Sequence, residues 1–215
     1  QHRQMLDQVL EIFGLKPDYD LNIMRDRQTL EGITVRALTG LCDVFKEEKP
    51  DLVLVHGDTT TTFAGALAAY YNKIKVGHVE AGLRTYNKME PFPEEMNRRL
   101  TGAIADFNFS PTKLAKENLL KENTPADSIF VTGNTVIDAL KTTLEDDYVF
   151  SESVLNTIDY KKTRLIAVTA HRRENLGEPL ENICRAIKRI VTDFEDVTVV
   201  YAVHKNPAVT EPVHK

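Results

Sequence analysis

Short apolar runs alternate with amphipathic stretches along most of this chain, and that alternation limits the possible folds more than any other feature. Apolar runs of strand length occur at 51–56, 75–79, 107–110, 129–132, 165–169 and 197–203. Helical patterns separate or precede them at 33–48, 60–71, 112–122, 136–144 and 178–194. Strands that alternate with helices predict an α/β protein with a parallel sheet and right-handed crossovers. The run at 51–56 is predicted to be a buried strand with a polar tip.

Residues 145–163 interrupt the alternation with charged residues and weak periodicity. The chain is therefore expected to change domain near Gly133–Asn134 or within this segment. We predict an N-terminal Rossmann-like domain over residues 1–134, followed by the start of a second Rossmann-like domain over 135–215.

Composition excludes several classes of function. The 215 residues include 27 Lys and Arg against 32 Asp and Glu, which gives a net charge of −5. An acidic chain lacks the general electrostatic attraction that nucleic acids require, so no nucleic-acid partner is expected. No apolar run approaches the roughly 20 residues of a membrane helix, and no membrane association is expected. The two cysteines provide no disulfide framework, which agrees with a cytoplasmic location.

Unusual polar residues follow the predicted strands, where ligands bind in open parallel sheets. His56–Gly57–Asp58 precedes four threonines, an arrangement that either binds an anion or simply caps a helix. Glu80 and Arg84 follow the strand at 75–79 and form either a site or a surface ion pair.

Three further clusters lie farther along the chain. Glu94 and Glu95 follow two prolines and are expected in the first turn of a helix, where the helix dipole alone would favour them. His171, Arg172 and Arg173 follow a predicted strand and suit a phosphate, although a salt-bridge cluster is the alternative. His204 follows the last strand and is by itself a weak signal.

Together, Asp58, Glu80 and Glu94 are expected near one edge of one sheet. Crowded carboxylates repel, so one of them is expected to keep its proton near neutral pH and to support acid–base chemistry. The basic residues of the second half would hold a phosphate. A metal site from His56, Asp58 and His78 matches no familiar spacing, and no metal is expected.

Eight motifs now occur in a fixed order: QHRQM, DLVLVHGDTTTT, VGHVEAGLRT, PFPEEMNRRL, FSPT, VTGNTVIDAL, TAHRRENLG and VHKNP. In this order they closely resemble the non-hydrolysing bacterial UDP-N-acetylglucosamine 2-epimerases over nearly the whole chain. The resemblance implies two Rossmann-like domains of the GT-B type. It also implies interconversion of UDP-GlcNAc and UDP-ManNAc for cell-surface polysaccharide synthesis. The reaction would eliminate UDP and add it back through 2-acetamidoglucal, with no cofactor.

By the same resemblance, Asp58, Glu80, Glu94 and His171 match the family's catalytic residues. The resemblance assigns substrate contacts to His171, Arg172 and Thr59. Some members of the family bind a second UDP-GlcNAc as an allosteric activator, and the matching positions here are Gln1, Gln4, Arg27, Glu94, Arg172 and His204. A homodimer is also expected from the family.

The chain departs from the family pattern at its ends. The resemblance implies an earlier strand with a Gly-Thr-Arg-Pro-Glu loop and a later Gly-rich segment that grips the nucleotide. A fragment truncated at both ends is therefore expected, and residues 1–215 alone are predicted to be inactive. A hydrolysing 2-epimerase, a GT-B glycosyltransferase and a non-catalytic nucleotide-sugar sensor stay open as alternatives.

Overall fold

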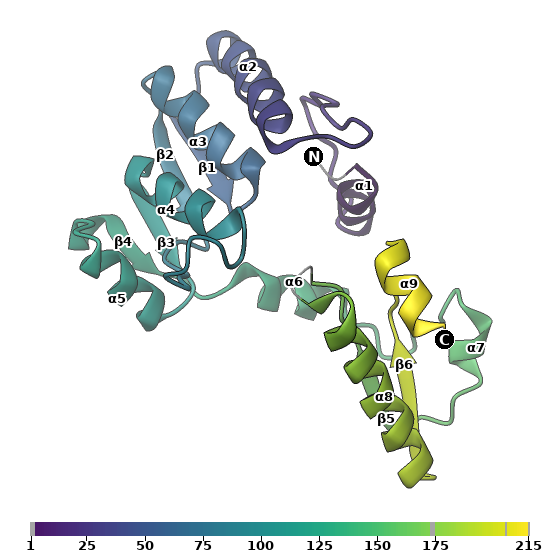
Figure 1. The fold of residues 1–215 in the computed structure, drawn as a ribbon. Coiled ribbons are helices and arrows are strands. Elements are labelled where there is room, and N and C mark those ends of the chain that lie inside the picture. The colour runs from purple at the N-terminus through teal and green to yellow at the C-terminus, as the bar shows by residue number, and fades with distance from the viewer. Residues whose placement is uncertain (1–2, 173–174, 205, 215) are drawn as a thin grey trace. The chain divides into compact units, whose positions relative to one another are not determined.

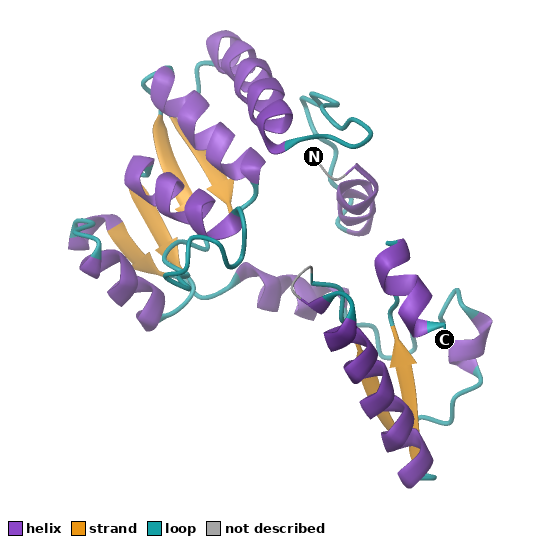
Figure 2. Cartoon of the chain, viewed as in Figure 1, coloured by secondary structure: helices purple, strands orange, loops and turns teal. Residues whose placement is uncertain are grey.

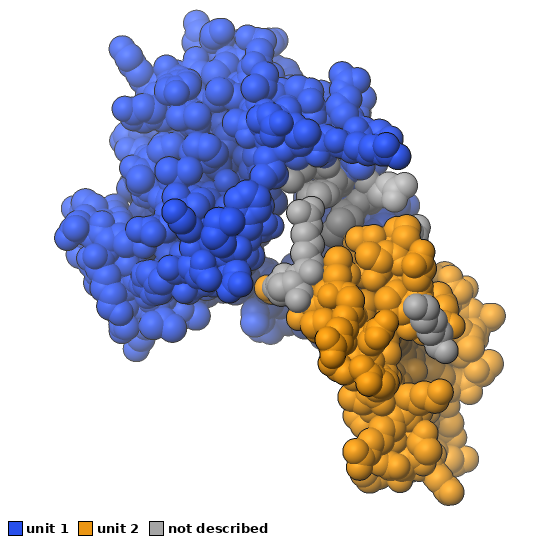
Figure 3. All heavy atoms as spheres, viewed as in Figure 1, with its two compact units in different colours: residues 1–144 blue, residues 145–215 orange. Residues whose placement is uncertain are grey.

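The computed structural model describes residues 3–172, 175–204 and 206–214, apart from the side chains of Gln4 and Met5. The chain forms two compact units, Gln1–Leu144 and Glu145–Lys215, which Figure 3 shows in blue and orange. The predicted domains of residues 1–134 and 135–215 differ from these units by the ten residues 135–144, and that domain division stays a prediction.

The first unit contains a four-stranded parallel sheet whose spatial order follows the sequence (Figure 1). Its strands are β1 (Leu52–His56), β2 (Lys75–Val79), β3 (Phe107–Ser110) and β4 (Ile129–Val131). His56 at the end of β1 pairs with Val79 at the end of β2, and Val79 pairs with Phe109. The carboxyl ends of neighbouring strands therefore meet at one edge, as the sequence predicts.

Three crossover helices cover one face of this sheet (Figures 1 and 2). They are α3 (Thr60–Tyr71), α4 (Glu94–Ile104) and α5 (Lys113–Lys121), with a short 3-10 turn, η1 (Ala126–Ser128), before β4. Helix α2 (Leu30–Glu48) packs against α3, while α1 (Arg3–Ile12) precedes it and α6 (Thr135–Thr143) follows β4. Helix α2 begins three residues earlier than predicted because Thr29 caps it, accepting a hydrogen bond from the Gly32 amide at 3.2 Å.

The core of the first unit forms where α3 meets the sheet. Ala66, Ala68 and Ala69 are fully buried in a cluster with Phe45 of α2 and Val76 of β2. Small side chains on α3 let the neighbouring helix and the sheet approach closely, which explains why an alanine-rich helix occupies the centre of the unit.

The prediction of a buried strand at 51–56 is wrong for one face of β1. Leu52 and Leu54 are 41% and 60% exposed, whereas Val55 is buried beneath α3. Successive residues of a strand point to opposite faces, and the helices among the described residues cover only the Val55 face. The aromatic rings of Phe109 and Phe130 lie 5.8 Å apart in a cross-strand pair on the other face.

The second unit has a two-stranded parallel sheet of β5 (Arg164–Val168) and β6 (Val197–Tyr201). Helix α8 (Glu178–Asp193) connects the strands, with α7 (Ser153–Asn156) before them and α9 (Pro207–Val213) after them. Strand β6 ends two residues earlier than predicted. Helices α7 and α9 are short, and neither they nor α1 is predicted from the sequence.

Cys42 in α2 and Cys184 in α8 are both free and half-buried. Across the described ranges, no helix combines the length and apolar character that crossing a membrane requires.

Gly82, in the loop after β2, should not tolerate a side chain. It has a φ of +88°, and a Cβ atom there would lie 2.2 Å from the backbone oxygen of Ala115 in α5. We expect Gly82→Ala to lower the free energy of unfolding by about 3 kcal/mol or more, because backbone strain adds to a clash with backbone that cannot move aside. Urea denaturation would measure the loss.

Gly133 provides the matched control. Its φ is +83°, but a Cβ there would meet no atom within 4 Å. Gly133→Ala should therefore cost only the conformational penalty of about 1–2 kcal/mol. Equal losses in the two variants would show that the close approach to α5 contributes nothing.

Candidate active site

The chain leaves β1 through a tight turn that presents Asp58 at the edge of the sheet. Gly57 has a φ of +74°, and Thr59 then caps α3 by accepting a hydrogen bond from the Thr62 amide at 3.2 Å. The Thr62 hydroxyl donates to the His56 carbonyl oxygen at 2.6 Å. The capping interpretation of the threonine run is confirmed for Thr59, whose contact with substrate stays a prediction.

Glu80 occupies the corresponding position after β2. Its backbone lies in the left-handed region with a φ of +69°, which is uncommon for a residue other than glycine and often marks a functional site. Its Oε1 accepts a hydrogen bond from Asn134 Nδ2 at 3.1 Å, and its Oε2 lies 3.7 Å from His56 Nε2. The side chain is half-buried, so one carboxylate stands beside the tip of β1 with both oxygens engaged.

The paired glutamates at the start of α4 have different environments. Glu94 is half-buried in the first turn, as predicted. Glu95 is fully buried, and its carboxylate accepts hydrogen bonds from the backbone amides of Thr85 at 3.0 Å and Tyr86 at 3.2 Å. Glu95 thus anchors the loop that follows β2, while Glu94 stays partly accessible.

Helix α4 also holds the turn after β1. Arg98 forms an ion pair with Asp58 and lies 3.7 Å from Glu95 Oε2, measured from Nη1. Asn97 donates a hydrogen bond from Nδ2 to the Asp58 backbone oxygen at 2.8 Å. Neither residue is predicted from the sequence, although the i, i+3 spacing of Glu95 and Arg98 is a signal that indicates such a pair.

Arg84 does not form the surface ion pair that the sequence left open. Its side chain is fully buried, and its Nε and Nη2 each donate to the Glu122 carboxylate at 2.8 Å. Asn118, on α5, donates to the Gly82 carbonyl oxygen at 2.9 Å, and Glu122 is the residue that ends this helix. These contacts tie the loop after β2 to α5, so Arg84 is structural.

His78 lies fully buried in β2, one residue before that strand ends. Its Nε2 is 2.8 Å from the carbonyl oxygen of Gly57, and its pKa is lowered to about 4, chiefly because burial penalises the charged imidazolium. Among the described residues, no group of three or more His, Cys, Asp or Glu side chains is arranged to hold a metal ion.

The basic residues of the second unit follow its two strands. His171 and Arg172 come after β5 and His204 after β6, and the rings of His171 and His204 stack with centroids 5.1 Å apart. His204 Nδ1 accepts a hydrogen bond from the Asn206 amide at 3.1 Å. Arg173 lies outside the described residues.

Gln1, Gln4 and Arg27 are three of the residues predicted to bind an activator. Arg27 lies exposed in a turn before α2, whereas Gln1 and the Gln4 side chain lie outside the described residues. Asp58 and Glu80 follow neighbouring strands at one edge of the first unit's sheet, and Arg98, one turn after Glu94 in α4, pairs with Asp58. The convergence of Glu94 with these two carboxylates stays a prediction. Because His171 belongs to the second unit, its convergence with them stays a prediction.

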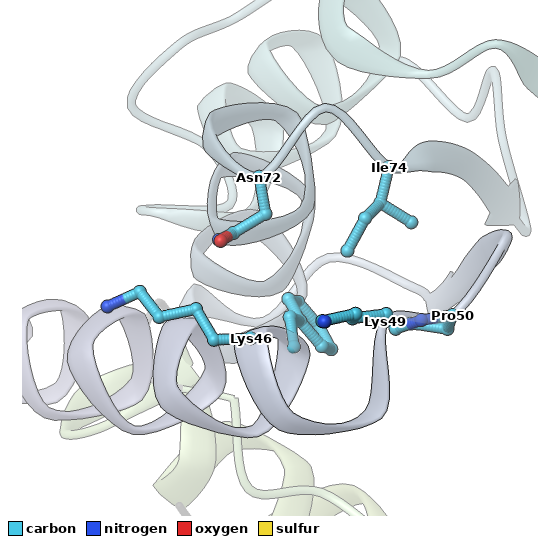
Figure 4. Close-up of a pocket in the computed structure, with 6 residues that line it drawn as sticks. Lys46, Lys49, Pro50, Asn72 and Ile74 are labelled. Carbon is cyan, nitrogen blue, oxygen red and sulfur yellow. The ribbon is translucent and has the colours of Figure 1, made fainter.

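A hollow of about 400 Å³ lies at a different place in the first unit (Figure 4). It is lined by Phe45, Lys46, Lys49, Pro50, Asn72 and Ile74. Pro50 and Ile74 precede β1 and β2, so the hollow lies at the amino ends of the strands. Its lining includes no acid, and the strand tips are the better candidate site.

The chain is similar to known proteins along its whole length. The family model described as UDP-N-acetylglucosamine 2-epimerase matches residues 1–215. A UDP-N-acetylglucosamine 2-epimerase from Bacillus subtilis (strain 168) is 66% identical over 215 residues, which cover 100% of this chain and 56% of the relative. The chain thus spans little more than half the length of this curated relative.

Solved structures agree with the computed one. The crystal structure of UDP-GlcNAc 2-epimerase from Neisseria meningitidis bound to UDP-GlcNAc has a TM-score of 0.92 and 50% identity, over 100% of this chain and 59% of that chain. A crystal structure from Listeria monocytogenes has a TM-score of 0.92 and 58% identity, over 99% of this chain and 55% of that chain. These matches confirm the predicted fold class, α/β of the GT-B type.

Neighbouring glutamates should respond differently to the same substitution. Glu95→Gln should lower the free energy of unfolding by about 2 kcal/mol, because the buried carboxylate loses charge-assisted hydrogen bonds to two backbone amides. Glu94→Gln should change it by less than about 0.5 kcal/mol, since that side chain is half-buried and is not seen to hold a backbone group among the described residues. Urea denaturation of both variants would measure the two losses of stability, and equal losses would contradict the prediction.

The buried imidazole of His78 should make stability depend on pH. The unfolded chain binds the proton with a pKa near 6.5 and the folded chain with a pKa of about 4. Stability should therefore be fully present above pH 6.5, should fall by up to roughly 1.4 kcal/mol per pH unit below it, and should be lower by about 3 kcal/mol below pH 4.

Other groups titrate in the same range, so the comparison is with His78→Gln. Denaturation curves at several pH values between 7 and 4 should show a shallower decline for this variant. Parallel declines for the two proteins would mean that His78 is not the group responsible.

Proposed function

The chain belongs to the UDP-N-acetylglucosamine 2-epimerase family, and on that premise we propose that the protein interconverts UDP-GlcNAc and UDP-ManNAc. The observation that carries the proposal is the pair of carboxylates at adjacent strand tips, Asp58 after β1 and Glu80 after β2. The relative from Neisseria meningitidis was solved with UDP-GlcNAc bound, which supports the choice of substrate.

Epimerisation at C2 needs a group that removes a proton and a group that returns one to the opposite face of the sugar. The C2 proton passes to a carboxylate while the C1–O bond to UDP breaks, and the electron pair leaves with the diphosphate. The resulting 2-acetamidoglucal then takes a proton at C2 and UDP at C1. Asp58, Glu80 and Glu94 are the acid–base groups that we assign to these steps.

His171 and Arg172 are assigned to the departing diphosphate. An imidazole and a guanidinium suit this role, because both donate hydrogen bonds to phosphate oxygens and the guanidinium is always charged. Thr59 caps α3 at the same strand tip as Asp58, and a helix N-terminus favours an anion.

We also propose how the protein is regulated, where it acts and what its product is used for. A second UDP-GlcNAc would act as an allosteric activator, the protein would work as a homodimer in the cytoplasm, and its product would serve cell-surface polysaccharide synthesis. The activator would contact the following positions: Gln1, Gln4, Arg27, Glu94, Arg172 and His204.

Solvent exchange tests the proposed reaction directly. The full-length protein with UDP-GlcNAc in D₂O should yield UDP-ManNAc that carries deuterium at C2, as followed by proton NMR. Free ManNAc and UDP would instead indicate the hydrolysing branch. Unchanged substrate without exchange at C2 would overturn the epimerase proposal and leave glycosyl transfer to an acceptor as the next reaction to test.

A matched pair of variants tests the role of Asp58. Asp58→Asn should lower the rate of C2 exchange by roughly 10²- to 10⁴-fold, because the amide cannot accept the proton. Asp127→Asn removes an exposed carboxylate in η1 and should leave the rate unchanged. Similar rates for Asp58→Asn and the wild type would remove Asp58 from the mechanism.

A further inference from the structure

His78 is a buried titratable group that the proposed reaction does not use. It lies in β2 opposite Val55 of β1 and Asn108 of β3, and its side chain is fully buried on the face that α3 and α4 cover. An apolar residue could fill such a position without the cost of removing an imidazole from water. The single hydrogen bond that the ring makes therefore needs an explanation.

The partner of His78 defines its protonation state. A carbonyl oxygen only accepts hydrogen bonds, so the 2.8 Å contact with Gly57 requires Nε2 to carry the hydrogen. Nδ1 has no hydrogen-bond partner among the described residues, and burial favours the neutral ring. The geometry thus indicates a neutral imidazole with its hydrogen on Nε2, which acts as a donor to one backbone atom.

That backbone atom belongs to the turn that carries Asp58. The Gly57 amide donates to the Val79 carbonyl oxygen at 3.0 Å. Strand β2 therefore holds the amide of Gly57 through the Val79 backbone and its carbonyl oxygen through the His78 ring. The next carbonyl oxygen, that of Asp58, is held from α4 by Asn97. Successive peptide groups are fixed from two elements, which restricts where the Asp58 carboxylate can lie.

We propose that His78 is a positioning residue for Asp58: by donating from Nε2 to the Gly57 carbonyl oxygen, it fixes the turn that presents the Asp58 carboxylate to the sugar. This inference rests on the proposed function of Asp58 as an acid–base group. A carboxylate displaced by about 1 Å can lose up to 100-fold in rate while the substrate still binds. Loss of His78 should therefore reduce kcat and leave KM nearly unchanged.

Two substitutions of similar length and volume separate the hydrogen bond from packing. His78→Gln keeps an N–H donor close to the position of Nε2, whereas His78→Met fills similar space without a donor. In the full-length protein, His78→Met should lower kcat by about 10- to 100-fold with KM changed by less than about threefold. His78→Gln should recover most of that loss. Equal kcat values for the two variants, or a loss that appears mainly in KM, would overturn the proposal.

A second measurement does not depend on activity. Long-range proton–nitrogen NMR of the ¹⁵N-histidine-labelled wild-type protein reports the tautomer of each imidazole, and the His78 signal is the one that His78→Gln removes. We expect the neutral form with its hydrogen on Nε2 at pH 7. The opposite tautomer or an imidazolium would overturn the proposal. Absence of C2 exchange in the wild-type protein, with the expected tautomer present, would instead overturn the proposed function.

Discussion

The parallel pairing of β1 with β2 is the constraint on which the rest of the candidate site depends. His56 pairs with Val79, so the two strands end side by side, and the residues that follow them, Asp58 and Glu80, enter the same edge of the sheet. Antiparallel pairing would send one of these loops to the opposite edge. The 3.7 Å approach of His56 Nε2 to Glu80 Oε2 is a direct result of this register.

Helix α4 holds the loops that follow these two strands. Glu95 binds the loop after β2, Arg98 binds the carboxylate after β1, and Arg98 lies 3.7 Å from Glu95. One turn of helix therefore spans both loops. A partly buried network of this kind is rigid when its members satisfy one another, because a charged group removed from water is costly to leave unpaired. Glu94, on the same turn, is placed by the contacts of its neighbour.

Much of this arrangement is predictable from the sequence because it depends on local patterns. The apolar runs locate β2 and β3 to the residue, and the alanine-rich composition of 60–71 locates α3, since tertiary contacts reinforce those preferences. The exposed face of β1 is not predictable in this way. Leu52 and Leu54 have the composition of a buried strand, and which elements cover a sheet face is a property of the whole arrangement.

The same distinction separates the residues proposed to react from those that hold them. Asp58 and Glu80 could be proposed because strand tips are where parallel sheets bind ligands, a rule that needs only the order of elements. The positioning groups, such as Arg98 and Arg84, act through partners 40 and 38 residues away in the chain. No short-range pattern encodes these pairings. A sequence therefore indicates where a candidate site lies more readily than it indicates what keeps the candidate groups in place. Only the packed structure shows that Glu95 is buried and holds two backbone amides, whereas Glu94 is half-buried.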